Sequence, residues 1–186
     1  MFIDYTKEEK KEFEKQIDTF FERNGLIKKK NNDIFAIGTK LGFKIFSMPL
    51  PDGYDGVIAV ERDFKAIGID EKADPIKARF TVAHEIAHYI RESANGSLDS
   101  NGPIIALKDR IFHNEDKSKE EQIADYMAAA ILVPFDEFKK DLLDNGLSLP
   151  IEYSNAQKLD PILIENLATS YNVEPNLIIR RIAEVY

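Results

Sequence analysis

The sequence contains no cysteine and no tryptophan, and only 3 of its 186 residues are histidine. Without cysteine there is no disulfide framework and no thiolate metal site, so any bound metal ion has to use histidine nitrogens and carboxylate oxygens. Long apolar runs are also missing: no segment reaches the roughly 18 apolar residues of a membrane-spanning helix, and the N-terminus has no apolar signal-peptide core. We therefore expect a cytoplasmic protein with no membrane partner.

Basic residues are fewer than acidic residues in this chain. Lys and Arg number 25 against 33 Asp and Glu, which gives a net charge of −8. The basic run Lys28–Lys30 is short and has acidic flanks, so we interpret it as solvated surface, and no direct nucleic-acid partner is expected. Hydrophobic residues make up 44% of the chain, enough for one folded domain with a core.

The segment Arg79–Ile90 carries the pattern H-E-x-x-H and holds two of the three histidines. Asp74 and Pro75 form a favourable helix start, because Asp can cap free N–H groups and Pro is preferred at the first helical position. Apolar residues then follow helical spacing, and no glycine or proline interrupts them before Gly96. A helix is therefore predicted over about 75–92.

His84 and His88 lie four residues apart, so on that helix they share one face and can bind a single Zn²⁺ ion. Glu85 lies beside the first histidine, where it can accept a proton from a water molecule at the metal instead of binding the ion. The alternative is a core helix that happens to carry two histidines, but this pattern is rare by chance in a chain so poor in histidine.

Periodicity and turn residues predict an α+β protein, with a small three-stranded antiparallel sheet packed on a mostly helical domain. Residues 65–70 are our candidate for an edge strand that could pair with an extended peptide, and an ordinary covered strand is the equal alternative. The strands are expected at 43–48, 57–60 and 66–70. Further helices are expected at 6–23, 34–40, 118–132, 135–145, 161–171 and 175–185.

We expect residues 1–186 to form a single domain. Its parts are an N-terminal helical region at 1–28, the sheet within 43–70, the metal-binding helices with their connecting loop within 75–146, and a C-terminal helical pair within 158–186. The polar segment 93–117 is expected to be a long surface loop with a short ordered piece at 104–112. A loop of that length in a small domain often covers or binds something.

A catalytic zinc ion needs three protein ligands and one open position. Glu92 cannot be the third ligand, because it lies eight residues beyond His84, about 12 Å along the helix axis. The longer metzincin pattern is excluded as well, since Ala94 stands in place of its third histidine and Arg91 in place of its glycine.

His113 on the predicted loop and Glu121 on the following helix remain as candidates for the third ligand. We prefer Glu121, because Asp125 one turn later can accept the free N–H of a metal-bound histidine and fix its orientation. The alternatives are a capping box between Ser118 and Glu121 and a plain surface charge at Asp125.

Two blocks of the sequence resemble the ImmA/IrrE metallopeptidases. Residues 79–88, RFTVAHEIAH, match the family pattern R-F-T-x-A-H-E-x-x-H, and residues 121–134, EQIADYMAAAILVP, match E-x-x-A-[ND]-x-[FM]-A-x-x-[IL]-L-x-P. The tail 167–173, LATSYNV, resembles L-A-x-x-[FY]-x-V. The resemblance covers about residues 30–186, and departures such as Ile86-Ala87, where Leu-Gly is common, touch no candidate ligand.

The resemblance implies a zincin-like fold and a gluzincin-like zinc peptidase. Family substrates are typically helix-turn-helix repressors of a mobile element, phage or stress regulon, and their cleavage relieves repression. The resemblance also implies that His84, His88 and Glu121 bind Zn²⁺ and that Glu85 is the general base, in agreement with the choice made from spacing.

Amide hydrolysis also needs a donor that stabilises the developing oxyanion. Tyr89, Tyr126, His113 and Arg79 are available by residue type. We favour His113 as this transition-state donor and expect the two tyrosines to pack beside the site.

Two other functions stay open. A zinc-bound module could antagonise a repressor by docking without cutting it. The closing helices at 161–185 could bind DNA, because the segment 167–173 is typical of a helix-turn-helix turn, but only Arg180 and Arg181 supply local basic charge.

Overall fold

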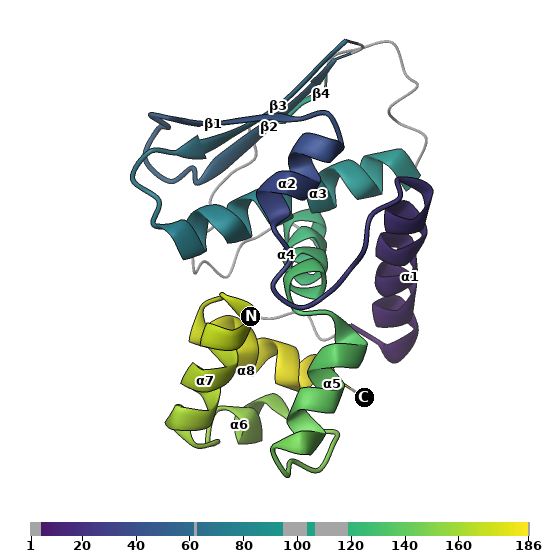
Figure 1. Cartoon of the computed structure of the whole chain (residues 1–186), viewed down its shortest axis with the longest axis vertical. Coiled ribbons are helices and arrows are strands. Elements are labelled where there is room, and N and C mark those ends of the chain that lie inside the picture. The colour runs from purple at the N-terminus through teal and green to yellow at the C-terminus, as the bar shows by residue number, and fades with distance from the viewer. Residues whose placement is uncertain (1–4, 62, 95–103, 107–118, 186) are drawn as a thin grey trace.

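A computed structural model describes residues 5–61, 63–94, 104–106 and 119–185 (Figure 1). The helices are α1 (Lys7–Arg23), α2 (Ile34–Lys40), α3 (Pro75–Ala94), α4 (Lys119–Leu132), α5 (Phe135–Asp144), α6 (Tyr153–Ala156), α7 (Pro161–Tyr171) and α8 (Pro175–Glu184). The strands are β1 (Lys44–Met48), β2 (Gly56–Glu61), β3 (Phe64–Asp70) and β4 (Ile104–Ala106). In Figure 1 the sheet lies above α3, α4 runs through the middle, and α5 to α8 gather below.

The α+β class is confirmed, but the prediction of a three-stranded, fully antiparallel sheet is wrong. Among the residues that the structure describes, the sheet has four strands in the order β1-β3-β2-β4. The pairs β2–β3 and β2–β4 are antiparallel, whereas β1 and β3 are parallel, with Lys44 opposite Ala66. The prediction failed because β1 and β2 follow one another in sequence without pairing, and β3 enters between them.

Of the two alternatives for residues 65–70, the edge strand is wrong and the ordinary covered strand is correct. β3 has β1 on one side and β2 on the other, so its backbone groups are already used in two ladders. Ala66, Ile67 and Ile69 on this strand are buried. Within the described residues, the two edges of the sheet are β1 and β4.

The predicted helices are present with small shifts at their ends, and side-chain caps explain several starts. Thr6 and Glu9 form the predicted capping box of α1. The Asp74 carboxylate accepts hydrogen bonds of 2.9 Å from the backbone N–H groups of Ile76 and Lys77 at the start of α3. The short helix α6 was missed, since no helix was expected between 145 and 161. In the described part of the chain, no helix combines the length and apolar character needed to cross a bilayer.

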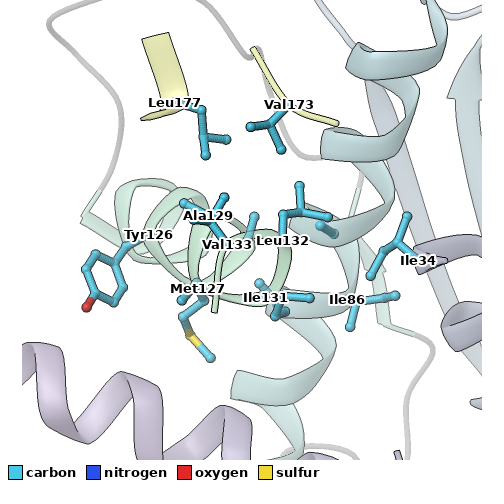
Figure 2. Packing of buried hydrophobic residues seen from close by; sticks show 14 of the residues in the cluster. Ile34, Ile86, Tyr126, Met127, Ala129, Ile131, Leu132, Val133, Val173 and Leu177 are labelled. Carbon is cyan, nitrogen blue, oxygen red and sulfur yellow. The ribbon is translucent and has the colours of Figure 1, made fainter. Parts of the chain in front are cut away.

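The helix α4 is at the centre of the core. All of its residues from Ile123 to Leu132 are buried, and small alanine side chains in this stretch allow close packing against α3. Figure 2 shows Ile131 and Leu132 of α4 beside Ile86 of α3, with Ile34 of α2 nearby. The helix that carries the predicted third ligand is therefore fixed rigidly beside the helix that carries the histidines.

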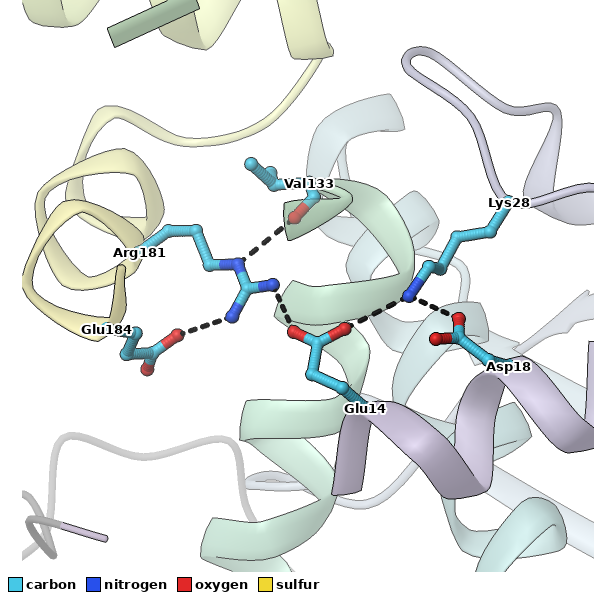
Figure 3. Close-up of polar contacts among 6 residues, drawn as sticks. All are labelled: Glu14, Asp18, Lys28, Val133, Arg181 and Glu184. Carbon is cyan, nitrogen blue, oxygen red and sulfur yellow. Dashed lines mark hydrogen bonds and ion pairs between the residues drawn. The ribbon is translucent and has the colours of Figure 1, made fainter. Parts of the chain in front are cut away.

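A buried ionic cluster joins α1 to α8 and to the end of α4 (Figure 3). Arg181 is fully buried, forms ion pairs with Glu14 and Glu184, and donates a hydrogen bond of 3.0 Å to the Val133 carbonyl oxygen. Glu14 also pairs with Lys28 at 3.0 Å. The segments at the two ends of the described chain are thus held together by a network whose charges are largely hidden from water.

The interpretation of Lys28–Lys30 as solvated surface is correct only for Lys29. Lys28 lies between Glu14 and Asp18, at 3.0 and 2.6 Å, and Lys30 pairs with Asp141 at 2.6 Å. The two outer lysines are partly buried and neutralised by acidic side chains of this same chain. Their positive charges are therefore compensated within the chain.

Replacing Glu14 with Gln should lower the free energy of unfolding at pH 7 by about 3 kcal/mol, because Arg181 would lose a buried charged partner. Burial favours the neutral carboxyl, but the charges of Arg181 and Lys28 outweigh it and lower the pKa of Glu14 below 4.5. The stability gained from its charge is therefore present above pH 4.5 and lost as the pH falls through the lower, folded-state pKa. Urea unfolding of both proteins at pH 7 and at about pH 3 measures this.

The matched control for this prediction is Asp18→Asn. Asp18 pairs with the same Lys28, but its side chain is 51% exposed. Its replacement should change the free energy of unfolding by less than about 1 kcal/mol. Equal losses in the two variants, or a loss in Glu14→Gln that does not shrink in acid, would contradict the buried-pair explanation.

Candidate metal centre

The helices α3 and α4 bring three side chains to one point. The Nε2 atoms of His84 and His88 lie 3.0 Å apart. Glu121 on α4 places Oε2 at 3.1 Å from His84 Nε2 and Oε1 at 3.3 Å from His88 Nε2. One ligand atom of each residue lies within 4.8 Å of those of the others, and both histidines are only 4% exposed.

This arrangement fits a divalent metal ion. Four ligands at the usual 2.0–2.1 Å from a tetrahedral zinc ion are separated from one another by roughly 3.3 Å, close to the separations between these three side chains. Two imidazole nitrogens and a carboxylate that face the same point repel one another unless a proton or a metal ion lies between them. Imidazole with carboxylate is a donor set that suits zinc and related first-row ions.

Asp125 completes the arrangement from α4. Its Oδ1 lies 3.0 Å from His84 Nδ1, and its side chain is buried, so the alternative of a surface charge at Asp125 is wrong. A proton on Nδ1 of His84, donated to this carboxylate, leaves the lone pair of Nε2 directed at the metal position. The structure thus brings His84, His88, Glu121 and Asp125 together as the spacing predicted.

Residues 39–183 match the family model described as the IrrE N-terminal-like domain, Peptidase_M78. The chain belongs to this family. All of the site residues described above lie inside the matched region of the M78 domain, whereas α1 precedes it. Among curated proteins, none matches the chain significantly.

The M78 domain is also similar to the solved structure of a Mycobacterium tuberculosis transcriptional regulator. The TM-score is 0.53 and the sequence identity is 15%, with 91% of this chain and 46% of that chain covered. This chain therefore spans about half the length of that protein. At such low identity the likeness extends to the fold alone.

Glu85 is buried on α3 beside His84 but is not one of the three converging ligands. Its negative charge is one of the influences that raise the pKa of His84. In the M78 domain the carboxylate lies against Gly56 at the start of β2, a neighbour that the sequence analysis missed. The sequence could have indicated this contact, because Gly56 alternates along β2 with the large apolar residues Ile58 and Val60.

Three of the four candidates for the transition-state donor have contacts elsewhere in the core. Tyr89 accepts a hydrogen bond of 2.6 Å from Lys65, and Tyr126 packs its ring against Tyr5, with ring centroids 5.7 Å apart. Arg79 donates a hydrogen bond to the backbone carbonyl oxygen of Asn32. His113, which we favoured, lies outside the described residues, as does Ser118, the alternative capping partner of Glu121.

The electrostatics of the M78 site favour a cation. Burial alone would favour the neutral imidazole, but hydrogen bonds to Asp125 and Glu121 outweigh it and raise the pKa of His84 to about 10. Burial would likewise favour the neutral carboxyl of Glu121, yet its contacts with His84 and His88 lower its pKa strongly. Without a metal ion, the site is therefore expected to hold a proton on His84 at neutral pH.

Zinc binding should release about one proton per ion at neutral pH. The reason is that His84, with a pKa of about 10, is protonated in the metal-free protein and must become neutral to bind the ion. Isothermal titration calorimetry in buffers of different ionisation enthalpy measures the number of protons released. Binding without proton release at neutral pH would show that His84 is already neutral.

Replacing Asp125 with Asn should weaken zinc binding about 10- to 100-fold, because the orientation and basicity of His84 depend on this carboxylate. Competition with a chelator measures the dissociation constant. Glu120→Gln is the matched control, since Glu120 lies on the same helix with an exposed side chain. Equal affinities in the two variants would contradict the role assigned to Asp125.

Proposed function

We propose that the protein is a zinc-dependent endopeptidase that cleaves a protein substrate. The observation that carries this proposal is the convergence of His84, His88 and Glu121 on one point, with a further buried carboxylate, Glu85, next to the first ligand. Membership of the M78 family supports the assignment, because this combination in a peptidase family is the arrangement that metal-assisted amide hydrolysis needs.

In the proposed reaction each side chain has one task. His84, His88 and Glu121 would hold the ion, which when bound acts as a Lewis acid that polarises the scissile carbonyl and makes water more acidic. Glu85 accepts a proton from the attacking water and delivers it to the leaving amine as the C–N bond breaks. Asp125 keeps the ring of His84 in the tautomer that leaves Nε2 available.

We propose a helix-turn-helix transcriptional repressor of a mobile element, phage or stress regulon as the substrate, so that cleavage relieves repression. This choice rests on the resemblance to ImmA/IrrE proteins, and the M78 match supports it at the level of the family. The structurally similar M. tuberculosis protein is described as a transcriptional regulator, which agrees with a setting in transcriptional control.

Two alternatives differ from this proposal in ways that can be observed. A zinc-bound anti-repressor would bind the same partner and leave it uncut. DNA binding by α7 and α8 is opposed by the structure, because Arg181, one of the two local arginines, is fully buried and paired with Glu14 and Glu184. A guanidinium in that position has no access to a phosphate backbone.

The deciding experiment is incubation of the zinc-loaded protein with a helix-turn-helix repressor encoded beside its gene. We expect two fragments in place of the intact repressor, with masses that add up to it plus one water, and no cleavage after a chelator is added. A repressor that stays intact but co-purifies with the zinc-loaded protein would instead support the docking module.

Glu85→Gln should abolish this cleavage, with a loss of at least about 100-fold in kcat, because the amide cannot accept the proton. Zinc affinity should stay near that of the wild type, since Glu85 is not among the converging ligands. Fragment formation and chelator competition measure the two quantities. Normal cleavage by Glu85→Gln would show that another group is the general base.

A further inference from the structure

Gly56, the first residue of β2, lies directly against the proposed general base. A Cβ atom added at Gly56 would lie 3.0 Å from Glu85 Oε1 and 2.4 Å from Thr81 Cγ2. Both of these side chains come from α3. The strand approaches the helix so closely here that any side chain at position 56 would have to displace one of them.

The backbone does not explain why this residue is glycine. Gly42 and Gly53 have positive φ values, which favour glycine, but the φ of Gly56 is not in that region. The pattern of the strand indicates that the lack of space for a side chain requires glycine at this position. Ile58 and Val60 alternate with Gly56 on the face toward α3 and are buried core residues, so a β-branched side chain would be the ordinary choice at position 56.

The side chains of Thr81 and Glu85, which lie against Gly56, differ in how easily they can be displaced. Thr81 is β-branched, stands in a helix and donates its hydroxyl to the Lys77 carbonyl oxygen at 3.0 Å, so its methyl group is held in place. The carboxylate of Glu85 is at the end of a longer side chain and can move by a few tenths of an ångström. A small displacement of that size matters for a proton acceptor, because catalysis depends on its geometry.

We propose that Gly56 is a positioning residue for Glu85: its missing side chain leaves the space in which the carboxylate is held between β2 and α3, beside His84. This inference rests on the proposed peptidase function. The metal ligands should not respond to a change at Gly56, because they meet on the side of α3 that faces Glu121 and Asp125 of α4. Gly56 would therefore affect turnover without affecting metal binding.

The test compares Thr81→Ser with the double variant Gly56→Ala/Thr81→Ser. Serine keeps the hydroxyl of Thr81 but lacks the Cγ2 methyl group, which removes the 2.4 Å collision. The nearest atom to the new Cβ is then Glu85 Oε1 at 3.0 Å, and the next, the Gly68 carbonyl oxygen, is at an ordinary 3.5 Å. The double variant therefore presses on the carboxylate alone.

Relative to Thr81→Ser, the double variant should have kcat about tenfold lower on the repressor, with KM and zinc affinity unchanged. Gly68→Ala is the control for a glycine on the paired strand β3, because its Cβ would meet Met48 Sδ at 2.7 Å and Val57 Cγ1 at 2.8 Å and not Thr81 or Glu85. It should lower the melting temperature and keep the wild-type kcat. Equal kcat values for the double variant and Thr81→Ser, or a parallel loss of zinc affinity, would overturn the proposal.

A second measurement does not depend on any substrate. The carboxyl ¹³C resonance of Glu85, assigned by its absence in Glu85→Gln, is compared in the zinc-loaded Thr81→Ser and double variants. A shifted resonance in the double variant supports the positioning role, and an unchanged one overturns it. If the resonance shifts but the wild-type protein cuts no repressor, the peptidase proposal fails while the contact between Gly56 and Glu85 stands.

Discussion

The contact between α3 and α4 is the constraint on which the site depends, because it buries polar side chains inside an apolar interface. His84 and His88 on α3 meet Glu121 and Asp125 on α4, and each of these groups would be strongly destabilising if it were buried without a partner. The alanine residues of α4 allow the helices to come close enough for these partners to meet. The positions of these four side chains are therefore set by the packing of α3 against α4.

The helix α1 lies outside the matched M78 region, yet it is part of the same structure. Glu14 supplies a buried carboxylate to Arg181 of α8, while Phe13 packs against Tyr126, the neighbour of Asp125 on α4. Through these contacts α1 fixes both the C-terminal helices and the helix that carries half of the site. A fragment that begins at the family boundary would lose one of the two carboxylate partners of a fully buried arginine.

The features that could be predicted from sequence are those set by local chemistry. Asp74 marks the start of α3 through its own hydrogen bonds, and helical spacing alone places His84 and His88 on one face. The errors concern contacts between distant segments. Nothing in residues 49–55 distinguishes a hairpin from a connection that leaves room for β3, so the parallel pairing of β1 was missed. Lys28 looked solvated because its partner Glu14 lies on another segment.

Two clusters, one around Arg181 and one around His84, bury charged groups in the core and compensate their charges differently. At Arg181 the positive charge is permanent, and Glu14 and Glu184 compensate it at all pH values where carboxylates are ionised. At the metal centre, in the absence of an ion, the positive charge has to come from a proton on His84. Its stabilising effect is complete below the ordinary pKa of 6.5 and is lost as the pH rises through about 10. A divalent ion supplies positive charge without that dependence, and it requires the proton to leave. Because the three converging side chains come from packed helices, we infer that exchanging a proton for a metal ion would require no refolding of α3 and α4.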